Sequence, residues 1–201
     1  MTDAGSTKRD VIEAVRRNLF SHLAHVVPAH PIAGAERSGV EAAQATLYLD
    51  RRVVVTPLAE NTPAAIERVF AFWRACGALV SSMSPEDHDR VFAAVSHLPH
   101  LLAFALVHEF AARDDADRLF GFAAGGFRDF TRIASSHPEM WRDICVANRQ
   151  ALIGELDAYS AELARLRALL ADGDGAALEA TFTLARTVRN DWLAGKLPGQ
   201  R

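Results

Sequence analysis

The chain changes character near residue 84, and this change limits the folds open to it. Before residue 84, short runs of β-branched residues alternate with stretches of helical periodicity, whereas after it almost every stretch is helical. Alternating strands and helices are typical of an α/β sheet domain. The sequence therefore predicts an α/β portion at residues 1–83 and an all-helical domain at residues 84–201, which together make an α+β fold that is mainly α.

The predicted α/β portion contains two helices and three short strands. An amphipathic helix is expected over residues 7–23, and strands are expected at residues 25–27, 52–56 and 78–80. Thr62 and Pro63 read as the N-cap and first position of a second helix. This helix is expected to run to about Cys76, with Gly77 as its C-cap.

The helical domain begins at Ser84-Pro85, and its first helix is expected to reach about Ala112. Pro99 lies inside this helix and should remove one backbone hydrogen bond and kink it. A glycine-rich break is expected at Gly125-Gly126, and a further long helix opens at residues 136–139.

Apolar residues in the last part of the chain repeat in steps of four and three. One helix carries Leu152, Leu156, Tyr159, Leu163, Leu166 and Leu170, and after a turn at residues 172–175 a last helix carries Leu178, Phe182, Ala185 and Trp192. The pattern predicts an antiparallel hairpin. It leaves open whether the hairpin packs within one subunit or also covers a second chain.

Composition excludes several classes of partner. The formal net charge is -3 and the pI about 6.2, which gives no electrostatic case for nucleic acid or an anionic membrane. Residues 98–107 form the longest apolar run, interrupted by Pro99 and His100, and a span needs about 20 residues. The polar N-terminus has no signal-peptide pattern, and two distant cysteines match no metal or redox spacing. We expect a cytoplasmic protein that does not enter a membrane.

Three clusters of residues could carry chemistry. His30, followed by a Pro/Gly turn, is a candidate general base or an uninvolved loop histidine. His97 and His100 share a helix face, which fits a lined cleft better than a metal pair, because no third ligand has diagnostic spacing. Gly125 and Gly126 stand close to two arginines, whose guanidinium groups suit carboxylates unless a local acid pairs with them. No metal site is expected.

Four segments, in order, resemble the prephenate dehydrogenase family. Residues 3–8 (DAGSTK) resemble its D-x-G-S-x-K loop, and residues 30–39 resemble its H-P-[IM]-x-G-x-E-x-S-G segment. Residues 96–100 match S-H-L-P-H, and residues 125–143 are similar to its G-G-F-[RK]-D-x-T-R-[IV]-A…M-W-x-D signature. Each motif alone is weak, whereas four in the right order are highly specific.

The resemblance implies a role for each matching residue. His30 matches the catalytic histidine, and Ser6 matches a serine that hydrogen-bonds the substrate hydroxyl and orients the histidine. Arg132 matches the arginine that binds the ring carboxylate. Further substrate-binding positions are His97, His100, Gly125, Glu36 and Trp141, and the cofactor-binding positions are Ser6 and Lys8.

The resemblance also implies a reaction and an assembly. The family performs the NAD- or NADP-dependent oxidative decarboxylation of prephenate or arogenate in tyrosine biosynthesis. Its helical half, similar to the C-terminal domain of 6-phosphogluconate dehydrogenase, forms a homodimer. The sequence contains no G-x-G-x-x-G turn and begins directly ahead of Thr2-Asp3. We therefore expect a truncated form of the enzyme, with a non-catalytic dimerisation or ligand-sensing remnant as the alternative.

Overall fold

The computed structural model describes residues 1–34 and 39–196. Its contacts divide the chain into two compact units, Met1–Glu155 and Leu156–Arg201, and each is considered by itself below. Glu36, one of the expected substrate-binding residues, lies outside the described residues.

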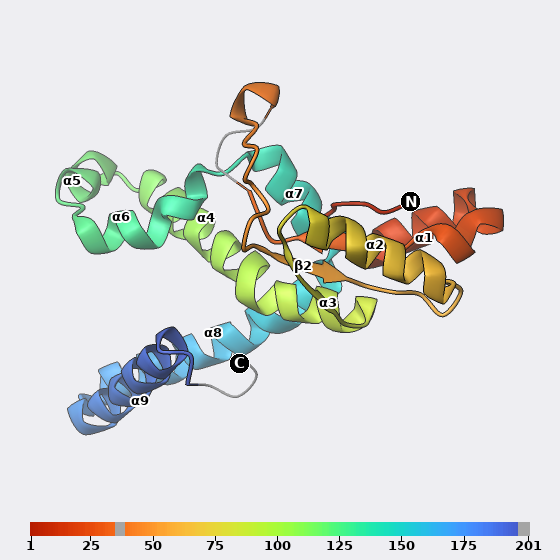
Figure 1. Cartoon of the computed structure of the whole chain (residues 1–201). Coiled ribbons are helices and arrows are strands. Elements are labelled where there is room, and N and C mark those ends of the chain that lie inside the picture. Colours follow the sequence, from red (N-terminus) through yellow and green to blue (C-terminus); the bar gives the residue numbers. More distant parts are fainter. Residues whose placement is uncertain (35–38, 197–201) are drawn as a thin grey trace. The chain divides into compact units, whose positions relative to one another are not determined.

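A three-stranded sheet forms the centre of the first half of unit 1. Its order is β1 (Ala29–Pro31), β2 (Arg52–Val55) and β3 (Leu79–Ser82). The central strand β2 runs antiparallel to β1, with His30 opposite Val54, and parallel to β3. Helix α2 (Pro63–Ala75) connects the two parallel strands and lies along the sheet (Figure 1). The hydroxyl of its N-cap, Thr62, accepts the N–H of Ala65 at 3.2 Å, as the sequence predicts.

The core of this half lies between the sheet and α2. β-branched side chains fill the strands because they pack well on a pleated surface. The buried cluster consists of Val27, Ala29, Val53, Val55, Val69, Trp73 and Ala78. This packing holds β1 rigidly and therefore fixes the position of His30.

The first strand lies four residues beyond its predicted position. Residues 20–25 form a 3-10 helix, η1 (Phe20–His25), which follows α1 (Arg9–Asn18), and the strand includes His30 itself. The helix predicted over 7–23 is therefore shorter and continues as a 3-10 helix, and the strand predicted over 25–27 is displaced. Pro31 is compatible with the strand because β1 is an edge strand, where a missing backbone N–H is tolerated.

The first helix of the helical half is interrupted where the sequence predicted a kink. It consists of α3 (Pro85–Phe92), a π-helical turn η3 (Ala93–His97) and α4 (Leu98–Ala111). Pro99 has no backbone N–H, and the π-helical turn directly before it absorbs the resulting change in hydrogen bonding. This turn ends at His97, so the irregularity positions a residue of the expected site.

The stretch Pro85–Ala111 is, by length and composition alone, long and apolar enough to cross a membrane. The expectation of no such segment considered only residues 98–107, whereas the helix continues on both sides of Pro99. The stretch also carries His88, Asp89 and His97, which are buried in a hydrogen-bonded network inside unit 1. The core helix of a folded domain explains these contacts better than a lipid-facing helix does.

Short helices complete unit 1: η2 (Val40–Ala42), α5 (Ala116–Gly121), α6 (Gly125–Thr131), η4 (Arg132–Ser135) and α7 (Pro138–Ala147). Gly125 and Gly126 begin α6 and are not loop residues, so the break predicted at these glycines lies just before them, at residues 122–124. The long helix predicted from residue 136 is also divided, because Asn148 separates α7 from α8 (Arg149–Asp172). The mainly helical α+β class predicted from the sequence is confirmed.

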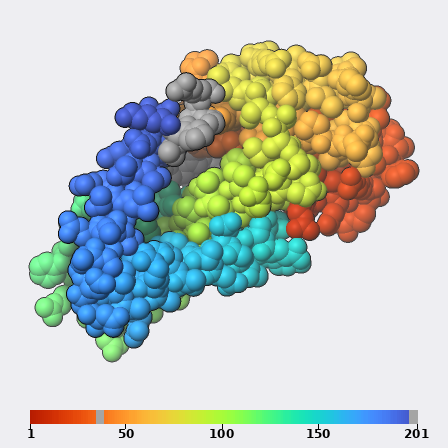
Figure 2. All heavy atoms as spheres, turned by 90° about the horizontal axis from the view of Figure 1, so that it is seen from below, coloured from red at the N-terminus to blue at the C-terminus, as the bar shows by residue number. Residues whose placement is uncertain are grey.

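Unit 2 contains the two helices that the sequence predicted, joined by a turn: the end of α8 and α9 (Gly175–Leu193). They meet near this turn, where Arg165 donates to the Thr181 hydroxyl at 3.3 Å, and the far end of α9 diverges from α8 (Figures 1 and 2). Asp174 caps α9 by accepting the N–H of Ala177 at 2.9 Å. Many of its large apolar side chains are exposed, namely Leu163, Leu170, Phe182, Leu184, Val188, Trp192 and Leu193.

We expect the same substitution to have opposite effects at two glycines of unit 1. Gly77 has φ +81° after α2, whereas Gly154 lies inside α8 with open space around a new Cβ. Gly77→Ala should lower the free energy of unfolding by about 1–2 kcal/mol, because an L residue is strained in the left-handed region. Gly154→Ala should raise it by about 0.5–1 kcal/mol through helix propensity. Urea denaturation of both variants checks this, and equal shifts would contradict it.

Candidate active site

Unit 1 contains a cavity of about 630 Å³ that brings together segments distant in sequence. Its walls come from the loop before α1, from β1 and the turn after it, from α3 to α4, and from η4 and α7. Six of the residues predicted from the sequence line it, namely Ser6, His30, His97, His100, Arg132 and Trp141.

Two predicted residues are not among the residues that line this cavity. Gly125 is the exposed first residue of α6, and Lys8 is fully buried behind the loop that carries Ser6. Phe92, Ser136 and His137 line the cavity although the sequence did not single out any of them as site residues.

The loop before α1 is held by a buried ion pair. The Lys8 ammonium lies 2.6 Å from Asp3 Oδ2 and donates to the carbonyl of Ala29 at 2.6 Å. Asp3 in turn accepts the N–H groups of Gly5 and Ala29. Burial lowers the pKa of Lys8, and the carboxylate of Asp3 opposes this shift. These contacts attach the loop to β1 and so place Ser6 in the same cavity wall as His30.

His30 is a partly buried imidazole in the middle of β1. Its Nδ1 lies 2.9 Å from Nε2 of His88, and its ring centroid lies 4.9 Å from that of Phe92. Burial lowers the pKa of His30 to about 3, and the neighbouring His88 and Lys8 act in the same direction. The ring is therefore neutral near pH 7, as a hydrogen-bond acceptor must be.

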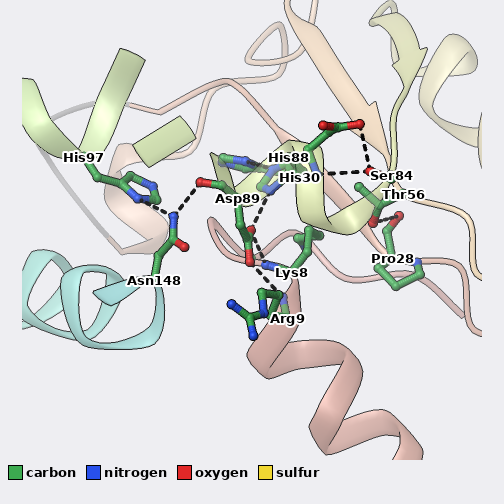
Figure 3. A network of polar contacts seen from close by, with 12 residues as sticks. Lys8, Arg9, Pro28, His30, Thr56, Ser84, His88, Asp89, His97 and Asn148 are labelled. Atoms are coloured by element: carbon green, nitrogen blue, oxygen red, sulfur yellow. Dashed lines mark hydrogen bonds and ion pairs between the residues drawn. The ribbon is translucent and has the colours of Figure 1, made fainter. Parts of the chain in front are cut away.

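His88 and Asp89 form a buried pair behind His30. Nδ1 of His88 lies 2.8 Å from Oδ1 of Asp89, whose carboxylate also accepts the N–H groups of Lys8 at 2.9 Å and Arg9 at 3.0 Å. Burial alone would raise the pKa of Asp89, but these hydrogen bonds lower it overall. Figure 3 shows the continuous row from Asp89 through His88 to His30.

Asn148 connects the same region to His97. Its Nδ2 donates to the backbone carbonyl of Asp89 at 2.7 Å and lies 3.1 Å from Nδ1 of His97 (Figure 3). Burial lowers the pKa of His97 to about 4. The break between α7 and α8 thus has a physical reason, since Asn148 satisfies two buried acceptors from this position.

His100 and Trp141 form a stacked pair in the cavity wall. Their ring centroids lie 3.5 Å apart with an interplanar angle of 17°, and Nδ1 of His100 donates to the carbonyl of Ser96 at 2.8 Å. Burial lowers the pKa of His100, with a further contribution from Arg132. The indole N–H of Trp141 is buried and has no hydrogen-bond partner among the described residues. Arg132 stands exposed in η4, at the edge of the cavity.

His88, Asp89 and Asn148 were missed by reasoning from the sequence. Residues 84–87 read as a helix start with acidic residues in the first turn, which describes the exposed Asp87 correctly but hides the buried pair that follows it. The sequence signal available was the adjacent His-Asp pair in a predicted helix, and it does not by itself show that the pair is buried. Asn148 carried no signal, because asparagine is common on solvated helix surfaces.

The arrangement combines a neutral imidazole with a guanidinium in one cavity. The imidazole can accept a hydrogen bond from a hydroxyl, and the guanidinium can bind a carboxylate with two parallel hydrogen bonds. Within residues 1–34 and 39–196, no group of three or more His, Cys, Asp or Glu side chains could hold a metal ion.

We expect stability to fall in mild acid because of His30 and His97. Their folded pKa values, about 3 and about 4, lie below the ordinary 6.5, so the unfolded chain binds protons first. Their contribution is complete above pH about 6.5 and is lost as the pH falls towards 4, by up to about 1.4 kcal/mol per histidine and pH unit.

Urea denaturation at about pH 7 and about pH 4.5 should show the free energy of unfolding falling by on the order of 2–4 kcal/mol. His97→Gln should reduce this pH dependence, whereas His22→Gln, at an exposed histidine, should leave it unchanged. A pH dependence that is identical in both variants would contradict the assignment.

Comparison with known proteins places the chain in a family. Residues 1–82 match the nucleotide-binding domain of prephenate dehydrogenase, and residues 84–184 match its dimerization domain. The chain is similar to a cyclohexadienyl dehydrogenase of Zymomonas mobilis (39% identity over 86% of this chain) and to a prephenate dehydrogenase of Bacillus subtilis (37% over 94%). It spans 59% and 51% of the lengths of these relatives.

A solved structure shows the same fold. The crystal structure of prephenate dehydrogenase from A. aeolicus in complex with hydroxyphenyl propionate and NAD+ matches with a TM-score of 0.87 and 36% identity. The match covers 94% of this chain and 66% of that one. Two adjoining family domains, relatives at this level of identity and the shared fold lead to one conclusion: the chain belongs to the prephenate dehydrogenase family.

Proposed function

We propose that this chain is the substrate-binding and dimer-forming part of a prephenate or arogenate dehydrogenase of tyrosine biosynthesis. The reaction is the oxidative decarboxylation of prephenate to 4-hydroxyphenylpyruvate with NAD or NADP as the oxidant. The observation that carries the proposal is that His30 and Arg132, distant in sequence, line the same cavity. Its volume of about 630 Å³ lies within the range of small-molecule sites.

The reaction requires a hydrogen-bond acceptor at the C4 hydroxyl of the cyclohexadiene ring. Hydride leaves C4 for the oxidant, the bond between the ring and its carboxylate breaks, and that electron pair completes the aromatic ring as CO2 departs. A hydrogen bond from the hydroxyl to His30 stabilises the positive charge that develops at C4. The low pKa of His30 keeps the acceptor lone pair available, and Ser6 lies in the same wall to orient the hydroxyl.

The two carboxylates of the substrate require positive charge or N–H donors. Arg132 supplies the permanent charge in our proposal and binds the ring carboxylate. His97, His100 and Trp141 surround the remaining wall and would contact the side chain. Prephenate and arogenate share the ring and differ only in this side chain, so the proposal covers both.

Of the two residues expected to contact the cofactor, Ser6 lines the cavity and Lys8 does not. NAD or NADP would supply the hydride acceptor, and Ala4 and Ser6, which line the cavity from the nucleotide-binding part of the chain, would contact it. The N–H groups of Lys8 and Arg9 at the start of α1 are already bound by Asp89, and the Lys8 ammonium is bound by Asp3. We therefore replace the expected cofactor contact of Lys8 by a structural role in holding the Ser6 loop.

We expect this chain to bind hydroxyphenyl propionate, the compound present in the relative's structure. Prephenate should bind as well, and Arg132→Met should weaken the binding of prephenate about 10- to 100-fold through loss of a charged hydrogen bond to the ring carboxylate. Hydroxyphenyl propionate has no ring carboxylate, so its binding should change much less in this variant. Arg16→Met is the matched control, because Arg16 is exposed and pairs with Glu60 outside the cavity. Isothermal titration calorimetry measures all three proteins.

A hydride-transfer assay with prephenate and NAD+ completes this test. His30→Asn should lower any turnover by about 100-fold or more, in line with loss of a general base. Ligand binding without cofactor reduction would identify the chain as the ligand-sensing alternative. Absence of binding, or binding of prephenate by Arg132→Met that equals that of the unchanged chain, would overturn the proposed site.

We further propose that the chain forms a homodimer through its helical part and that the division between domains follows residue 83. The match to a dimerization domain at residues 84–184 supports both points. Unit 2 supports the dimer, because Leu184 and Trp192 are 66% and 54% exposed on a groove that would otherwise leave apolar surface in water. A cytoplasmic location accords with the enzymes of this family.

Substitution in this groove should dissociate the dimer. Leu184→Glu combined with Val188→Glu places two charges on the exposed apolar surface and should raise the dimer dissociation constant at least about 100-fold. Thr187→Glu adds a charge on the same helix outside the groove and serves as the control. Sedimentation velocity measures the association. A double variant that dimerises like the control would rule out this surface.

A further inference from the structure

We propose that the buried pair His88–Asp89 is a positioning device that fixes the proton of His30 on Nδ1, so that His30 presents the lone pair of Nε2 to the substrate hydroxyl. The chemical use of this arrangement rests on the proposed function, whereas the position of the proton follows from the hydrogen bonds alone. Neither residue of the pair lines the cavity, so both act through His30.

In the hydrogen bond between Asp89 and His88, the imidazole is the donor and the carboxylate is the acceptor. Asp89 is 2% exposed and accepts two backbone N–H groups, from Lys8 and Arg9, as well as the contact from His88. An ionised carboxylate can only accept hydrogen bonds. Nδ1 of His88, 2.8 Å from Oδ1, must therefore be the donor.

The hydrogen bond between His88 and His30 then has a fixed donor as well. A neutral imidazole carries one N–H, and in His88 that proton is already on Nδ1. Nε2 of His88 is then an acceptor, so Nδ1 of His30, 2.9 Å away, must be the donor. The single proton of neutral His30 is thereby used, and Nε2 keeps its lone pair. The row of rings in Figure 3 shows that these bonds follow one another without a gap.

Asp89 also determines the tautomer of His97, in which the proton is on Nε2 and not on Nδ1. The carbonyl of Asp89 is an acceptor, which identifies the donating atom of Asn148 as Nδ2. This nitrogen also lies 3.1 Å from Nδ1 of His97, so that Nδ1 is an acceptor and the proton of neutral His97 is on Nε2. Asp89 thus determines one histidine with a free lone pair and another with a free N–H.

The position of the proton on His30 decides whether this ring can accept a hydrogen bond from the substrate hydroxyl. A hydroxyl that is to lose its proton must donate its hydrogen bond, and only the unprotonated nitrogen of His30 can accept it. In the other tautomer two donors would face one another. The buried pair removes this second state before substrate arrives, which is a form of preorganisation. His88 is fully buried, and its ring centroid lies 4.5 Å from that of Phe92, which restricts its rotation.

Nitrogen-15 NMR of the histidine rings tests the proposal without any ligand. In the wild-type chain, the ring of His30, assigned by its loss in His30→Gln, should show a protonated Nδ1 and an unprotonated Nε2. His88→Leu should convert it to a mixture of tautomers or to the Nε2–H form. His88→Gln should retain the wild-type state, because the amide oxygen can accept the Nδ1 proton. His22→Leu, at an exposed histidine, is the control.

A second variant keeps the test decisive if His88→Leu does not fold. His88→Phe keeps an aromatic ring beside Phe92 but offers no acceptor to Nδ1 of His30, so it should also release the fixed tautomer of His30. Circular dichroism confirms folding in each case. A wild-type His30 with its proton on Nε2, or an unchanged tautomer in a folded His88→Leu or His88→Phe variant, would overturn the proposal.

Kinetics separate a positioning role from general support of the fold. Where the protein turns over prephenate, His88→Leu should lower kcat about 100-fold with KM changed less than about threefold, and His88→Gln should recover about tenfold of the loss. A proportional rise in KM with unchanged kcat would contradict positioning. If the predicted tautomer is observed but hydroxyphenyl propionate does not bind, the proposed function fails and this inference stands. If binding depends on Arg132 but the tautomer of His30 does not depend on His88, the proposed function stands and this inference fails.

Discussion

The carboxylate of Asp89 is the interaction on which the geometry of unit 1 depends. It accepts N–H groups from the start of α1 and from His88, while the carbonyl of the same residue accepts from Asn148. A buried carboxylate without such donors would be strongly destabilising. Its burial therefore requires that the loop before α1, helix α3 and the junction of α7 with α8 meet at one point. The cavity walls are built from these same segments.

The helix caps and the second and third strands could be predicted from local patterns and most cavity residues from family motifs, whereas the buried network could not. Thr62 and Ser84 are N-caps because capping depends on a few neighbouring residues, which the sequence displays directly. His30, His97, His100 and Arg132 were found through a family resemblance and lie together in the cavity. His88 and Asp89 belong to the interior only because α3 packs against α1, and no local pattern expresses that contact.

Two irregularities in long helices have the same consequence for the site. The π-helical turn before Pro99 ends at His97, and the break at Asn148 directs its amide to His97 and Asp89. The first was foreseeable, because proline lacks an N–H wherever it occurs. The second was not, because asparagine fits a helix surface and only its tertiary acceptors reveal why the helix stops. The helix therefore stops at Asn148, where its amide donates to buried acceptors that would otherwise be unsatisfied.

Burial of the histidines links the chemistry of the site to the stability of the fold. Burial lowers the pKa of His30 to about 3 and the pKa of His97 to about 4, which keeps both rings neutral. A charged His30 would have no lone pair to accept a substrate hydroxyl, so neutrality is a condition of the proposed reaction. The same shift makes the unfolded chain the better proton acceptor below pH about 6.5. A more exposed His30 would withstand acid better, but it would be protonated during part of its time near neutral pH and would lose the fixed tautomer that a dry environment and His88 together maintain.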